Sequence, residues 1–109
     1  MTTVTFLLRG GLLAGFDISG HTGLASAGED ILCAAISSAA YLTANTITDV
    51  LGVKAKTAVS DGKLSVLVPK GEETKCRAVL KGLELHMKQL CEQYPKGIRI
   101  INLTTREGA

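Results

Sequence analysis

Hydrophobic and polar side chains alternate twice near the start of the chain, first over Val4–Leu8 and then over Leu12–Ile18. Because successive side chains of a strand point to opposite faces, this period of two predicts two half-buried strands. Gly10 and Gly11 stand between them, and paired glycines are a strong signal for a two-residue hairpin turn. The chain is therefore expected to open with a β-hairpin.

The spacing of apolar residues then changes from a strand pattern to a helical one. Between Asp30 and Leu51 the apolar residues recur at helical spacing, the middle of the segment is almost uncharged, and Gly52 supplies a stop. Polar positions are so few that we expect this helix to be buried on much of its circumference. A second helix is predicted over Glu72–Gln93, where one face is apolar and the charged residues lie elsewhere.

Three further segments alternate like strands: Ala55–Val59, Leu64–Val68 and Ile98–Leu103. Asp61 and Gly62 separate the first two and predict a hairpin turn. The resulting order is ββαββαβ. We therefore predict one α+β domain over residues 1–109, a mostly antiparallel five-stranded sheet packed with two helices.

Composition narrows the class of protein without identifying a function. Hydrophobic residues make up 46% of the chain and charged residues 20%, which is ordinary for a globular protein, and the net charge is +2. Basic residues are scattered and aromatic residues reach only 4%, so nucleic acid is not an expected partner. We find no signal peptide and no stretch near the roughly 20 apolar residues of a membrane span. We therefore expect a cytoplasmic protein whose three cysteines are free thiols.

The stretch GHTGLASAGEDILCAAIS, from Gly20 to Ser37, carries His21 and Cys33 at the two ends of a glycine-bearing loop. If the helix begins near Asp30, Cys33 falls in its first turn, where unpaired backbone N–H groups and the helix dipole favour a thiolate. A neighbouring imidazole favours the thiolate further, and a thiolate with an imidazole are the two catalytic groups that a cysteine hydrolase requires. Backbone N–H groups at the helix start are candidates for binding the oxyanion of the transition state.

Other residues of this stretch suit supporting roles. Asp30 is placed either to cap the helix or to orient His21, as the third group of a catalytic triad does. Gly20 and Gly23 are expected to let the loop backbone come close to a substrate chain, and together with Gly28 they are candidate hinge positions of the loop.

A purely structural interpretation stays open beside the catalytic one. Cysteine is among the most buried residue types, so Cys33 could serve packing alone, and a histidine after a strand could cap a turn. Cys76 and Cys91 lie on the apolar face of the second predicted helix and are expected in the core, with His86 at the surface. One histidine and one cysteine are too few ligands for a structural zinc ion, so no metal is expected.

The same stretch resembles the bacterial ribosomal-processing cysteine proteases. The resemblance rests on SGHTG, on the small-residue loop that closes on Gly28, and on EDILCAAIS, although Thr22 stands where the family often has alanine. It implies His21 and Cys33 as the catalytic pair, with Asp30 as the motif aspartate. It also implies a homodimer without a metal or organic cofactor. The implied substrate is the N-terminal extension of a large-subunit ribosomal protein, cut after a short hydrophobic motif that contains phenylalanine.

Two rival functions come from other classes. Small α+β domains with two helices also serve as non-enzymatic ribosome- or RNA-associated modules, and the slight basic excess permits that function. A redox-sensing dimer would use Cys33 as an exposed reactive thiol. Salt-sensitive RNA binding would favour the first rival, whereas Cys33-dependent peptide cleavage would favour the protease.

Overall fold

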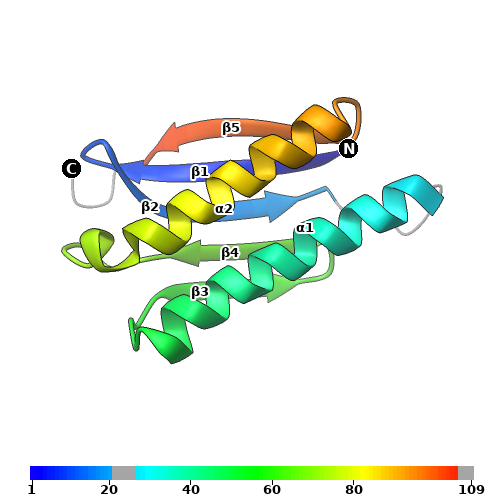
Figure 1. Ribbon diagram of the computed structural model, residues 1–109. Coiled ribbons are helices and arrows are strands. Elements are labelled where there is room, and N and C mark those ends of the chain that lie inside the picture. Colours follow the sequence, from blue (N-terminus) through cyan, green and yellow to red (C-terminus); the bar gives the residue numbers. More distant parts are fainter. Residues whose placement is uncertain (21–26, 106–109) are drawn as a thin grey trace.

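The computed structural model describes residues 1–20 and 27–105, with side-chain surroundings for residues 1–20 and 31–105. It confirms the predicted order of elements (Figure 1). The first half contains β1, β2 and a helix α1 that continues as one π-helical turn, η1; the second half contains β3, β4, α2 and β5. Their bounds are β1 Thr2–Arg9, β2 Leu12–Ser19, α1 Ala27–Asn45, η1 Thr46–Val50, β3 Lys56–Ser60, β4 Lys63–Leu67, α2 Glu73–Gln93 and β5 Ile98–Thr104.

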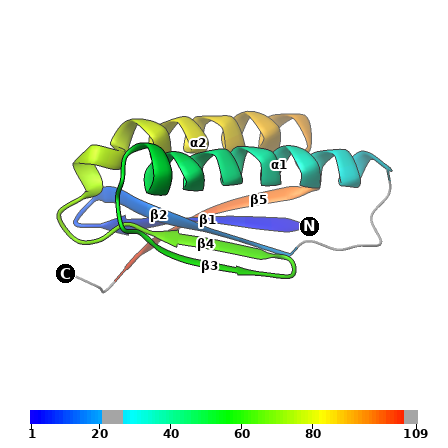
Figure 2. The same ribbon diagram turned by 90° about the horizontal axis from the view of Figure 1, so that it is seen from below.

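The five strands form one sheet in the order β3-β4-β2-β1-β5. The β1–β2, β2–β4 and β3–β4 pairs are antiparallel, and β1–β5 is the parallel pair, so the predicted mostly antiparallel sheet is confirmed. The predicted hairpin turns are also confirmed, because their glycines Gly10, Gly11 and Gly62 all adopt positive φ angles. Both helices lie on the same face of the sheet, which makes a fold of two layers (Figure 2).

The core lies between the sheet and the helix layer. α2 packs closely on β2 and β5, whereas α1 packs mainly on α2 and lies over the β3–β4 side of the sheet (Figures 1 and 2). The alternating residues predicted for the strands supply one side of the core and the helical stripes supply the other. The largest fully buried side chains include Phe6, Phe16, Val66, Ile36, Ile47, Leu80 and Met87.

The expectation that the first helix is buried on much of its circumference is wrong. Ile31, Leu42 and Val50 are 64%, 69% and 77% exposed, respectively. The reason is architectural: the helices cover one face of a single sheet, and among the described residues no third layer lies over them. The outer surface of α1 is therefore both apolar and accessible.

The apolar character of this helix also corrects the expectation about membrane-length segments. Ile31–Val50 spans 20 residues with a mean hydropathy of 1.3, enough to cross a membrane by length and composition alone. A third of the window is buried inside the fold, however. A core helix passes the same test, and the buried stripe Leu32, Ile36, Ala40, Ala44 and Ile47 belongs to the core.

A buried ion pair fixes the end of β1 to the start of α2. Arg9 Nη1 donates to Glu73 Oε2 at 2.7 Å and to the Val68 carbonyl at 2.9 Å, and both side chains of the ion pair are less than one-tenth exposed. The Gly71 N–H donates to Glu73 Oε1 at 2.9 Å. The hydrogen bond from Arg9, opposed in part by burial, lowers the pKa of Glu73 below its usual value.

This pair makes stability depend on pH in a defined direction. The pKa of Glu73 is lower in the folded chain than in the unfolded chain, so the ionised carboxylate stabilises the fold. This stabilisation is complete above about pH 4.5 and falls as the pH drops below that value. We expect Glu73→Gln to reduce the free energy of unfolding at pH 7 by about 2 kcal/mol. That deficit should shrink steadily between pH 4.5 and pH 2 in urea titrations.

The neighbouring Glu72 provides a matched control, because its ion pair with Lys75 is longer, at 3.8 Å, and exposed. Glu72→Gln should cost less than about 1 kcal/mol at pH 7. Equal losses of unfolding free energy in the two variants, or a Glu73→Gln loss that persists at pH 2, would contradict the stabilising role of the Arg9–Glu73 pair.

Candidate active site

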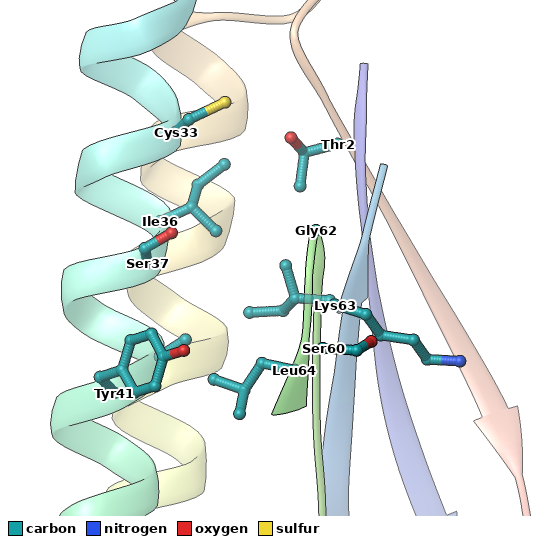
Figure 3. Close-up of a pocket in the computed structure, with 11 residues that line it drawn as sticks. Thr2, Cys33, Ile36, Ser37, Tyr41, Ser60, Gly62, Lys63 and Leu64 are labelled. Atoms are coloured by element: carbon teal, nitrogen blue, oxygen red, sulfur yellow. The ribbon is translucent and has the colours of Figure 1, made fainter. Parts of the chain in front are cut away.

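Cys33 lies on the side of α1 that faces the sheet and is half-buried (Figure 3). Its sulfur points away from the helix axis toward Thr2, at the start of β1. A hollow begins at this point and runs along α1, with the β3–β4 hairpin as its opposite wall. The thiol therefore faces an accessible space between two parts of the chain that are distant in sequence.

The hollow has an apolar floor and a polar rim. Ile36, Ala40, Ile18 and Leu64 supply apolar surface, and all belong to or pack on the core. Ser37 and Tyr41 follow Cys33 by one and two helical turns on the same side of α1, because residues four apart share a helix face. The opposite wall comes from the hairpin residues Ser60, Gly62 and Lys63.

Lys63 does not direct its charge into this hollow. Its ammonium group points away from α1 (Figure 3) and lies 3.9 Å from Asp17 Oδ1. The hollow is consequently lined by hydroxyl groups and hydrocarbon, has a volume of about 130 Å³ and is partly open to solvent. Such a surface suits an uncharged, largely apolar side chain of a ligand.

The start of α1 differs from the sequence prediction, and the difference changes the chemistry. The helix begins at Ala27, so Cys33 is its seventh residue and lies in the second turn, not the first. The field of the helix dipole falls off within the first turn, and an N–H in the second turn already bonds a carbonyl of its own helix. The prediction that the helix start stabilises the Cys33 thiolate and binds the oxyanion beside it is therefore not supported by the position of Cys33 in the helix.

The other predicted site residues have different outcomes. Asp30 is the fourth residue of α1, so it cannot be the capping residue that precedes the helix, and Gly28 also lies inside α1 instead of in the loop. His21 and Gly23 lie outside the described residues. The position of the imidazole relative to Cys33 thus remains a prediction.

Gly20 is the last described residue before His21, and it is held in place. It has a φ of +97°, and a Cβ there would lie 2.6 Å from the Met1 carbonyl oxygen, so both the backbone conformation and the close packing require glycine. Met1 and Thr2 are its neighbours, and Thr2 lines the hollow beside Cys33. The residue before His21 therefore lies at the Cys33 end of the hollow.

The two remaining cysteines occupy different surroundings. Cys76 is fully buried, as predicted, and burial followed by the charge of Glu72 raises the pKa of its thiol. Cys91 is half-buried on α2 and its Sγ lies 3.6 Å from the Ile98 carbonyl oxygen, to which it donates. His86 is exposed on the same helix, as predicted.

No three metal-binding side chains come together among the residues that the structure describes. The sequence analysis missed the residues across the hollow from Cys33. It also missed Tyr41 on α1, which helical periodicity would have found, whereas the hairpin wall depends on the position of β3 at the edge of the sheet.

Comparison with known proteins identifies the family. The family model described as cysteine protease Prp matches residues 1–99. No match was found among curated proteins.

Solved structures share the fold at low sequence identity. The protein SMU.848 from Streptococcus mutans aligns with a TM-score of 0.79 and 23% identity over 96% of both chains. The essential ribosomal processing protease Prp from Staphylococcus aureus, in complex with a substrate peptide, aligns with a TM-score of 0.85 and 19% identity over 94% of this chain and 100% of that chain. The same S. aureus protease with a covalently linked product peptide gives a TM-score of 0.82 and 20% identity over the same shares.

The family model covers nearly the whole length described above, including the stretch with Cys33 and the strands that enclose the hollow. This chain therefore belongs to the Prp family of cysteine proteases and is a cysteine peptidase.

Proposed function

We propose that this protein is an endopeptidase that removes the N-terminal extension of a large-subunit ribosomal protein, with Cys33 as the nucleophile. The observation that carries the proposal is the half-buried Cys33 thiol at the end of a hollow with an apolar floor, in a chain of a cysteine protease family. The S. aureus relative of the same fold is a ribosomal processing protease that binds a substrate peptide. A cytoplasmic location follows from such a substrate.

In this mechanism the Cys33 thiolate attacks the carbonyl carbon of the scissile peptide bond. The carbonyl π electrons move to oxygen, and His21, as the imidazolium, then protonates the leaving amine as the C–N bond breaks. The acyl group is left on sulfur as a thioester. Water, deprotonated by His21, attacks the thioester; the C–S bond breaks, the acid leaves, and the Cys33 thiolate and the His21 imidazolium are regenerated.

One structural feature supports the role of His21: Gly20, the residue before it, lies beside Thr2 at the Cys33 end of the hollow. For Asp30, the capping role is excluded by the helix start at Ala27, and we keep the role of orienting the imidazole as part of the proposal.

We also propose that the protein is a homodimer in which a second copy covers the outer surface of α1. The exposed residues Ile31 and Leu42 are apolar, and the segment Ile31–Thr48 contains no charged residue. Large exposed apolar patches mark interaction sites. An uncharged surface can contact its own copy about a two-fold axis without placing like charges together.

The first test is cleavage of a peptide that spans the ribosomal protein's extension, followed by mass spectrometry. Cys33→Ala should lower kcat by a factor on the order of 10⁴ or more, because it removes the nucleophile, and His21→Ala should also lose most of the activity. Cys91→Ala provides the matched control and should keep the parental rate. Cleavage by Cys33→Ala at the parental rate would refute the proposed function.

The dimer is tested by light scattering after size-exclusion chromatography. Leu42→Lys should raise the dimer dissociation constant at least about tenfold, because it buries an unpaired charge in the interface. Leu85→Lys is the matched control, since Leu85 is 59% exposed but lies on α2. A monomeric parent protein, or equal effects of the two variants, would argue against this interface.

A further inference from the structure

The edge of the sheet next to the hollow is open. β3 is the first strand in the sheet order, so its only partner is β4, and all five of its residues are exposed. Within residues 1–20 and 27–105 no other strand pairs with its outer side. An edge strand of this kind presents a row of backbone donors and acceptors to any extended chain that approaches.

The register shows which backbone groups face outward. The Val68 N–H donates to the Ala14 carbonyl at 2.8 Å, so Val68, and with it Val66 and Leu64 by the period of two, turns its backbone groups toward β2. The intervening β4 residues therefore pair with β3 at Ser60, Ala58 and Lys56. The outward groups are those that remain, the N–H and C=O of Thr57 and Val59.

The same register sets the direction of the side chains. Thr57 and Val59 stand opposite Val66 and Leu64, which are buried under the helices. Cross-strand partners point to the same face, so Thr57 and Val59 face the helix layer. A peptide strand beside β3 would likewise alternate, with every second side chain directed toward the space under α1.

This edge is continuous with the hollow at Cys33. Ser60, the last residue of β3, and Gly62 line the hollow together with Cys33 and Tyr41. Figure 2 shows β3 and α1 on the same side of the molecule, the helix above the strand. A chain that follows the β3 edge therefore reaches the thiol from the hairpin end.

The edge also lacks the features that usually block strand addition. Charged residues, prolines and bulges protect most exposed edges. Thr57–Ser60 contains no charged residue and no proline, the register with β4 is uninterrupted, and Lys56 lies at the end away from the hollow.

We propose that the substrate peptide docks as a sixth strand on the outer edge of β3, bonded to Thr57 and Val59, with alternate side chains entering the hollow beside Cys33. The inference rests on the proposed peptidase function and specifies how that site holds its substrate. Main-chain hydrogen bonds supply affinity in this binding mode, and pockets for alternate side chains supply specificity. The apolar floor of the hollow selects apolar side chains at those positions.

The decisive experiment uses a series of peptides, each N-methylated at one position, with the two residues that flank the scissile bond left unmodified. On one side of that bond, kcat/KM should fall about tenfold at every second position and less than about threefold at the positions between, because only alternate N–H groups bond to β3. A uniform effect along the peptide, or none at any position, would overturn the docking mode. Cleavage of the unmodified peptide shows separately that the peptidase function holds.

A variant of the protein tests the same bonds from the other side. Val59→Pro removes the outward N–H without removing a bond between β3 and β4, and edge strands tolerate proline at such positions. In a Cys33→Ala background it should raise the peptide dissociation constant about tenfold, whereas Val59→Ala, which keeps the N–H, should raise it less. Equal binding by the two variants would contradict the proposal; if Val59→Pro does not fold, the N-methylated series decides alone.

Discussion

The site depends on one packing constraint, the position of α1 over the β3–β4 side of a single sheet. α2 fills the space over β2 and β5 with large side chains, whereas α1 meets the sheet with Leu32, Ile36 and Ala40 on its inner stripe and small residues between them. The inner stripe of α1 belongs to the core, and an open hollow remains at the Cys33 end. The half-buried thiol therefore lies beside the core and faces a space that a ligand can enter.

Other parts of the fold hold this arrangement in place. The Arg9–Glu73 pair joins the β1–β2 hairpin to the start of α2, and α2 in turn supports the inner side of α1. Gly20 allows the end of β2 to pack against Met1 and Thr2, next to the hollow. The hollow is thus built from one helix, one hairpin and the two strand ends near Thr2. The apolar surface that this leaves on the outside of α1 is the surface we assign to a second copy.

Most of the fold could be predicted from the sequence because the signals are local. The alternation in β1 and β2, the glycines of the first turn and the apolar stripe of α2 each depend on neighbouring residues, and all appear where expected. The start of α1 was misplaced by three residues, since Asp30 resembles a helix cap whereas the helix runs back to Ala27. The exposure of α1 and the hairpin wall of the hollow were not predictable, because both follow from the tertiary order of strands and layers. Cys33 as the nucleophile stays a prediction from its neighbours in sequence; its thiol lies at the hollow, and the helix-start argument for its reactivity does not hold.

The most direct test of the account is active-site labelling with a peptide chloromethyl ketone built on the acyl side of the extension's cleavage sequence. The Cys33 sulfur would displace chloride from the chloromethyl carbon, and so become alkylated, only after the peptide has docked. We predict complete inactivation at one equivalent per chain, with the added mass on Cys33 and protection by excess uncleaved peptide. Inactivation with the label on Cys91 or Cys76, or stoichiometric labelling of Cys33 that leaves cleavage intact, would contradict the assignment of Cys33 as the nucleophile.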